Sequence, residues 1–161
     1  MEHVVYLALG ANLGDRLFNL RAAIGALAPA VRVLAESHIY ETPPWGYVDQ
    51  PPFLNMALKA ETDLSPHALL AHLKEIESGL GRAPSFRYGP RQIDIDILFY
   101  DDLILDEDGL VIPHPRLQER AFVLVPLADL ASDLRHPLFQ TTVAEMSSAL
   151  DPSGIRRADD A

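Results

Sequence analysis

Residues 87–100 read RYGPRQIDIDILFY, and their second half has the length and the β-branched and aromatic content of a strand. Side chains alternate between the two faces of a strand, so the odd-numbered residues from Ile93 to Phe99 are expected on one face. Asp94 and Asp96 are expected on the other, with the even-numbered residues up to Tyr100. Large apolar residues on both faces indicate a central strand that is covered on both sides.

The two carboxylates of Asp94 and Asp96 pose an electrostatic problem for this strand. They would lie about 6.6–6.8 Å apart along it and would repel each other unless a partner neutralised them. A divalent cation is one such partner, because Mg²⁺ is usually held by one or two carboxylates together with substrate phosphates. The alternative is a solvated strand end, where both charges face water.

The composition limits the classes of protein to which the chain can belong. A length of 161 residues predicts a single domain over 1–150, followed by a disordered, charged tail over 151–161. The net charge of −10 argues against a nucleic-acid surface, since binding a polyanion needs a basic patch. The first residues lack the basic region of a signal peptide, which favours the cytoplasm. With no cysteine, the chain has no disulfide and no thiol nucleophile.

The arginines are unevenly distributed despite the acidic composition. Five of them fall around the aspartate pair or soon after it: Arg82, Arg87, Arg91, Arg116 and Arg120. Guanidinium groups beside two carboxylates suit the binding of one small polyanion and its metal. Surface arginines without a ligand are the alternative.

The order of the predicted elements indicates the fold class. Strands are expected over 3–9, 30–40, 53–61 and 93–100, with one helix after Asp15 and another from Pro66 to Gly79. The order βαββαβ favours an α+β, ferredoxin-like sandwich. Extra C-terminal elements would be an apolar strand or strand end over 122–127 and a short helix over 141–150.

Two loops have the composition of binding loops. Residues 9–15, LGANLGD, resemble a phosphate-binding turn, but the Lys-Ser/Thr ending is missing, which favours a structural strand-to-helix turn. Residues 42–52 hold four prolines and cannot form a regular element. Such a long loop is either a lid over a site or a connector.

Several blocks, in this order and spacing, resemble a known family. They are LGANLG at 9–14, YETPP at 40–44, FLN at 53–55, RxGPRxxDIDIL at 87–98, PHPR at 113–116 and RAF at 120–122. The chain resembles the 6-hydroxymethyl-7,8-dihydropterin pyrophosphokinases of folate biosynthesis from about residue 4 to about residue 130. The resemblance implies transfer of diphosphate from ATP to the hydroxymethyl group of the reduced pterin, with release of AMP.

The resemblance also implies roles for individual residues. Asp94 and Asp96 would hold two Mg²⁺ ions that bridge the ATP phosphates, and Arg82 and Arg91 would complete the catalytic set. The implied ATP-binding residues are Glu77, Arg82, Tyr88, Arg91, Ile97, His114 and Arg120. The implied pterin-binding residues are Thr42, Pro43, Trp45, Phe53, Asn55 and Phe122.

The expected partners are therefore the small molecules ATP and a reduced pterin, with no nucleic acid and no membrane, and the protein is expected to be a monomer. Another two-metal nucleotide enzyme, such as a nucleotidyl cyclase or transferase, would explain the aspartates but leaves Phe53, Asn55 and Phe122 without a role. Two further hypotheses are a pterin-binding module without turnover and a nucleic-acid-binding ferredoxin-like domain.

Overall fold

The computed structural model describes residues 3–43, 51–80 and 93–158. The strands are β1 His3–Ala11, β2 Val31–Glu36, β3 Tyr40–Thr42, β4 Phe53–Thr62, β5 Asp94–Tyr100, β6 Leu105–Glu107, β7 Leu110–Ile112 and β8 Arg156–Arg157. The helices are α1 Arg16–Leu27, α2 Pro66–Gly79, the 3₁₀ turn Leu117–Glu119, α3 Ala121–Ala131 and α4 Val143–Ser148. Of the helices in these ranges, none has the length and hydropathy that crossing a membrane would require.

The main sheet is antiparallel, with the strand order β5-β1-β4-β3-β8. The long strand β4 pairs with β2 over residues 58–62 and with β3 over residues 53–55. Together β2 and β3 fill one position beside β4, so the single strand expected over 30–40 is in fact two. The sequence of neighbours β5, β1, β4 and β2/β3 is the ferredoxin-like arrangement, and the predicted α+β class is confirmed.

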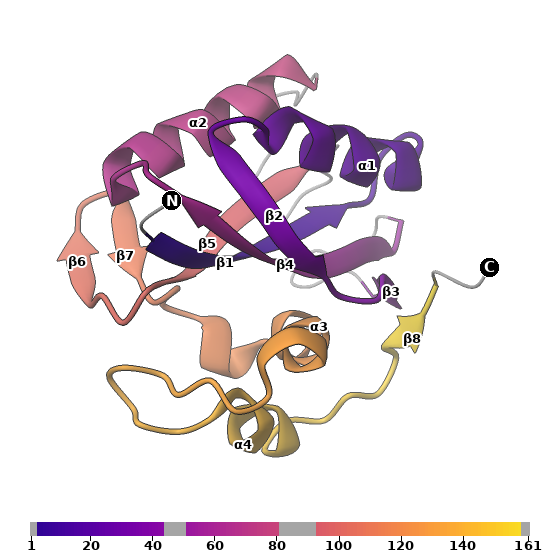
Figure 1. Ribbon diagram of the computed structural model, residues 1–161. Helices are drawn as coiled ribbons and strands as arrows, with labels where there is room; N and C mark the ends of the chain where they lie inside the picture. The colour runs from indigo at the N-terminus through magenta and orange to yellow at the C-terminus, as the bar shows by residue number, and fades with distance from the viewer. Residues whose placement is uncertain (1–2, 44–50, 81–92, 159–161) are drawn as a thin grey trace.

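Helices α1 and α2 cover one face of this sheet (Figure 1). Each begins at a local signal in the sequence: the Asp15 side chain accepts a hydrogen bond from Phe18 N at 3.0 Å, and the Ser65 hydroxyl accepts one from Ala68 N at 3.2 Å. The core on this face joins apolar residues of both helices to those of the strands, among them Leu7, Leu9, Leu20, Leu27, Met56, Leu69, Leu73, Ile93 and Ile95.

The opposite face is covered by α3, and α4 packs against α3 (Figure 1). The prediction of a strand over 122–127 is wrong, because these residues lie in α3. A short apolar run does not distinguish a buried strand from a buried helix by periodicity. In α3, Val123, Leu124 and Leu127 occupy positions i, i+1 and i+4 of one helix face, and all three are buried in the cluster that includes residues of the sheet.

A β-bulge changes the expected alternation of β5. Leu7 pairs with Ile97 and Tyr6 pairs with Phe99, so Leu98 is an extra residue in the ladder. Ile93, Ile95 and Ile97 lie in the core under α1 and α2, as expected. After the bulge the faces are exchanged. Phe99 packs on the α3 side and Tyr100 on the α1/α2 side, and the faces predicted for these two residues are wrong.

The C-terminal segment is ordered over the part that the structure describes. Arg156 and Arg157 form β8 and pair with Glu41 and Tyr40 at the edge of β3, so the expectation of a disordered tail from residue 151 is wrong as far as residue 158. Glu41 receives hydrogen bonds from both Arg16 and Arg156, and the bond from Arg16 lowers the pKa of its carboxyl. The bond from Arg156 holds the C-terminal segment against the sheet.

Replacing Phe99 by Ala should lower the free energy of unfolding by about 3–5 kcal/mol, because its buried ring leaves a cavity between the sheet and α3. The ring is 1% exposed and makes edge contacts with Tyr6 and His136, at centroid distances of 6.3 and 5.8 Å. Urea unfolding measures the loss. Phe18→Ala on α1 is the control, since that ring is 64% exposed and its removal should change stability by less than about 0.5 kcal/mol. Equal losses in both variants would contradict this packing of Phe99.

Candidate functional site

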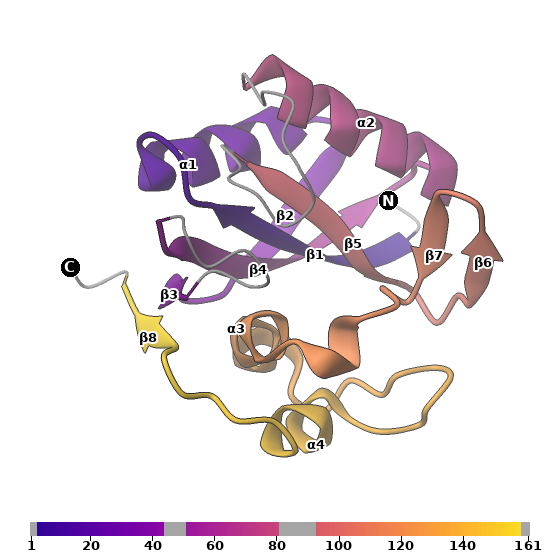
Figure 2. The same ribbon diagram turned by 180° about the vertical axis from the view of Figure 1, so that it is seen from behind.

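One row of residues runs across three neighbouring strands on the α3 side of the sheet. Gly10 of β1 pairs with Asn55 of β4 on one side and with Asp94 of β5 on the other. Two residues further along, Ala8 pairs with Asp96. The reverse view shows β1 and β5 side by side (Figure 2). The register therefore places the amide of Asn55 and the two predicted metal ligands on one face, two strand spacings or about 10 Å apart.

The aspartate pair offers the oxygen donors that a hard cation prefers. Asp94 and Asp96 are both half-buried, whereas Ile95 between them is 1% exposed and faces the core. Within the described ranges no three acidic or histidine side chains form a cluster that could hold a metal ion. Two carboxylates without a third protein ligand fit Mg²⁺ that takes its remaining oxygens from substrate phosphates and water.

Gly10 lies between the predicted pterin and metal residues, although the sequence analysis assigned it to a turn. It lies inside β1, and a Cβ at this position would be 2.7 Å from Asn55 Oδ1 and 3.7 Å from Phe53 Cδ1. Asn55 Nδ2 donates to Thr42 Oγ1 at 2.6 Å, which fixes the amide with Oδ1 over Gly10. A glycine inside a strand often marks a place where another group approaches the backbone closely. The glycine at position 10 was therefore the feature of the sequence that could have indicated this contact.

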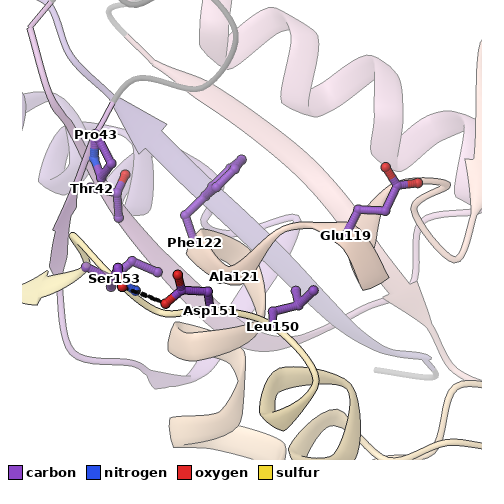
Figure 3. Close-up of a pocket in the computed structure, with 9 residues that line it drawn as sticks. Thr42, Pro43, Glu119, Ala121, Phe122, Leu150, Asp151 and Ser153 are labelled. Atoms are coloured by element: carbon purple, nitrogen blue, oxygen red, sulfur yellow. Dashed lines mark hydrogen bonds between the residues drawn. The ribbon is translucent and has the colours of Figure 1, made fainter.

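Three of the predicted pterin residues line a pocket at the end of β3 and the start of α3. Thr42, Pro43 and Phe122 line this pocket of about 250 Å³, in which Figure 3 shows the Phe122 ring pointing into the space between the two elements. Phe53 pairs with Thr42 across β3 and β4 and lies on the same face of the sheet as Asn55. The C-terminal segment supplies another part of the wall, for which the sequence carried no signal, through Leu150, Asp151, Ser153 and Ile155.

A second cavity, of about 300 Å³, lies beside the free edge of β5. Asp96, Ile97 and His114 line it, so three residues of the predicted metal and ATP sites meet here. Apolar side chains and the β6–β7 hairpin form much of its wall: Leu70, Leu110, Val111 and Pro115. His114 N donates to Leu98 O at 3.1 Å, which attaches this segment to the bulge of β5.

His114 is a neutral imidazole. Burial, together with the charges of Arg120 and Arg116, lowers its pKa from 6.5 to about 4. Its Nδ1 accepts a hydrogen bond from Arg116 N at 3.2 Å, so the ring proton is on Nε2. His114 can therefore donate one hydrogen bond to an anion, but it does not add a positive charge at neutral pH.

The other predicted ATP residues are placed as follows. The Arg120 guanidinium lies over the Phe122 ring, 5.6 Å from its centroid, so a predicted phosphate contact adjoins the predicted pterin pocket. Glu77 is 1% exposed, and its carboxylate is turned to the backbone of β5. Trp45, Arg82, Tyr88 and Arg91 lie outside the described residues.

Known proteins resemble this chain over nearly its whole length. Residues 6–132 match the family described as 7,8-dihydro-6-hydroxymethylpterin-pyrophosphokinase (HPPK). A 2-amino-4-hydroxy-6-hydroxymethyldihydropteridine pyrophosphokinase of Methylorubrum extorquens is 49% identical over 156 residues, which are 96% of this chain and 98% of the relative. The enzyme of the same name from Bacillus subtilis is 43% identical, over 97% of this chain and 90% of the relative.

Solved structures agree on the fold. An HPPK-DHPS protein in complex with substrates superposes with a TM-score of 0.77 at 16% identity, over 91% of this chain and 43% of the other. At that identity the likeness supports the architecture alone. The sequence matches carry the assignment of activity, which is pyrophosphokinase activity in folate biosynthesis. The chain belongs to the 7,8-dihydro-6-hydroxymethylpterin-pyrophosphokinase family.

Proposed function

We propose that the row Asn55–Gly10–Asp94 holds the pterin and the ATP phosphates in line for diphosphate transfer. The observation that carries this proposal is the register of β1, which pairs Gly10 with Asn55 and with Asp94. A flat ring held at Asn55 points its hydroxymethyl group along the sheet toward the aspartate pair. Diphosphate transfer requires the protein mainly to position the two substrates and to stabilise charge. The row Asn55–Gly10–Asp94 would position the pterin relative to the ATP phosphates.

The pterin ring lies against the sheet with its amide edge at Asn55. Because Asn55 Nδ2 is used by Thr42, Oδ1 is the acceptor left for the N–H groups of the ring. Phe53 and Phe122 provide aromatic faces on which the ring stacks, with Thr42 and Pro43 beside it. Trp45 completes this set in our proposal.

The adenine base occupies the cavity beside β5. The neighbouring backbone groups of this edge are already used, since Ile95 N donates to Glu77 and Leu98 O accepts from His114 N. Ile97 lies between them and lines the cavity, so its backbone is placed to meet the polar edge of the base. The apolar side chains Leu70 and Val111 contact the ring faces.

The reaction forms a bond between the pterin hydroxymethyl oxygen and the β-phosphorus of ATP. The bond from that phosphorus to the oxygen shared with the α-phosphate breaks, and AMP leaves. Two Mg²⁺ ions bound by Asp94 and Asp96 would neutralise phosphate charge and lower the pKa of the attacking hydroxyl. Arg82, Arg91 and Arg120 would bind the phosphates, and the Nε2–H of His114 would donate to one of their oxygens. Tyr88 completes the predicted nucleotide set, and Glu77 belongs to it through its hydrogen bond with Ile95 N.

A monomer in the cytoplasm remains our prediction for the state in which the protein acts. Light scattering after size exclusion would test the monomer, and fractionation of the source cell would test the location.

Incubation with ATP, Mg²⁺ and 6-hydroxymethyl-7,8-dihydropterin should yield AMP and the pterin diphosphate. Chromatography of the nucleotides separates AMP from ADP. ADP as the product would reject diphosphate transfer, and pyrophosphate release would favour a nucleotidyl transferase instead. Asp96→Ala should lower AMP formation more than about 100-fold, since it removes half of the metal-binding carboxylates, while pterin binding stays measurable.

The matched control for Asp96→Ala is Asp102→Ala. This exposed residue follows β5 in the next turn, so the control removes one negative charge from the same segment without touching the site. Substantial turnover in Asp96→Ala, comparable to that of Asp102→Ala, would contradict the assignment of the metal ligands.

Gly10→Ala should raise the KM for the pterin about tenfold and leave the KM for ATP nearly unchanged. The new methyl group would lie 2.7 Å from Asn55 Oδ1, so the amide must leave its position and one hydrogen bond to the ring is lost. Steady-state kinetics with each substrate varied in turn measures both constants. Gly25→Ala on α1, where no atom lies within 4 Å of the added carbon, serves as the control. An unchanged pterin KM in Gly10→Ala would refute the placement of Asn55.

Wild-type protein should lose stability relative to His114→Asn as the pH falls from 6.5 to about 4. In this window the unfolded chain binds a proton at His114 that the folded protein does not, because folding lowers the pKa to about 4. The difference in unfolding free energy between the two proteins should change by about 3 kcal/mol across the window. Urea unfolding at a series of pH values measures it.

Asparagine is chosen for His114 because its side-chain oxygen can still accept from Arg116 N. His67→Asn, at a surface position 60% exposed, controls for the removal of a histidine. A difference between wild type and His114→Asn that is constant with pH would show that His114 is not held neutral.

A further inference from the structure

Glu77 is a buried carboxylate at the end of α2, close to the free edge of β5. It is 1% exposed, although an acidic side chain is seldom fully buried unless it is paired. Its Oε2 accepts a hydrogen bond from Ile95 N at 2.8 Å. Its Oε1 lies 3.4 Å from the ammonium of Lys74, one turn earlier on the same helix. The carboxylate is thus directed at the backbone of β5.

Ile95 is the residue between the two metal-binding aspartates. On one edge, β5 is fixed by β1, where Gly10 pairs with Asp94 and Ala8 pairs with Asp96. On the other edge no strand of the described chain pairs with residues 94–96, and the hydrogen bond from Glu77 takes that place. The three residues 94–96 are therefore held from both sides, and the direction of both carboxylates is fixed with them.

Glu77 does not line the cavity that we assign to the nucleotide. Lys74, which also contacts Glu77, does line it, together with Asp96 and His114. Glu77 thus contacts a residue of the cavity wall and the backbone of β5, without itself lining the cavity. This place differs from the direct nucleotide contact expected from the sequence.

We infer that Glu77 is a positioning residue for the metal site: it holds Ile95 and thereby sets the geometry of Asp94 and Asp96. The inference rests on the proposed function, in which these aspartates bind the metal. Residues that orient the metal ligands without binding the metal themselves typically change metal affinity or activity 10–100-fold when they are mutated. A hydrogen bond to a buried backbone N–H is also costly to leave unmade, so its loss moves the strand.

Two substitutions separate this role from a direct contact with the nucleotide. Glu77→Gln keeps an oxygen that can accept from Ile95 N and removes the charge. Glu77→Leu keeps the volume and removes the acceptor. Glu75→Gln is the matched control, since it removes one charge from an exposed position on the same helix.

The first measurement is Mn²⁺ binding, followed by electron paramagnetic resonance, in the presence of an ATP analogue with a methylene group between the α- and β-phosphates. No transfer to pterin takes place, so the readout is independent of turnover. Glu77→Leu should bind Mn²⁺ 10–100-fold more weakly than wild type, and Glu77→Gln should stay within about threefold of it. Amide hydrogen exchange should show loss of protection at Ile95 in Glu77→Leu alone, in a protein that still unfolds cooperatively.

The outcomes distinguish this inference from the proposed function. If wild type itself does not bind Mn²⁺ with the nucleotide, both are overturned. If wild type binds and Glu77→Leu binds equally well, the positioning role alone is overturned. If Glu77→Gln and Glu77→Leu lose metal-free nucleotide affinity to the same extent while Ile95 stays protected, Glu77 is a direct nucleotide ligand and the inference is wrong.

Discussion

The register of β1 between β4 and β5 is the constraint on which the site depends. Leu7 and Leu9 are fully buried under α1 and α2, and alternation along the strand then turns Gly10 to the other face. A slip of one residue would exchange the two faces of β5 and bring Asp94 into the apolar core, where an unpaired charge is strongly unfavourable. The hydrophobic core thus selects the register, and the register assembles the functional row.

The α3 side of the sheet is divided between packing and binding. At one end of this face, Tyr6, Ala57 and Phe99 pack against α3, and the bulge at Leu98 is what turns Phe99 to this side. At the other end of the same strands, Gly10 and Asp94 lie outside that apolar cluster. The bulge therefore lets one short strand be polar where ligands bind and apolar where the helix packs.

The sequence predicted the features that depend on neighbouring residues. The helix starts at Asp15 and Ser65 are examples, because each side chain caps its own helix. The features that could not be predicted depend on partners distant in the chain. Phe99 changes face because of a bulge set by pairing with β1, and the C-terminal segment is ordered because Arg156 meets Glu41. The family resemblance predicted which residues form the site. Their arrangement, and the reason for a glycine at position 10, required the strand register.

The charge of the molecule bears on which form of ATP it binds. The chain carries a net charge of −10, and its site adds two carboxylates that would repel free ATP. Mg²⁺ is usually held by one or two carboxylates together with substrate phosphates, which matches the aspartate pair of the proposed site. In the proposed site, the aspartates and the phosphates would both give oxygen ligands to the cation, and the cation would neutralise part of the phosphate charge. We therefore expect the nucleotide to bind as its magnesium complex. Asp94 and Asp96, which β1 and Glu77 hold in place, would then complete the ligand set of the metal.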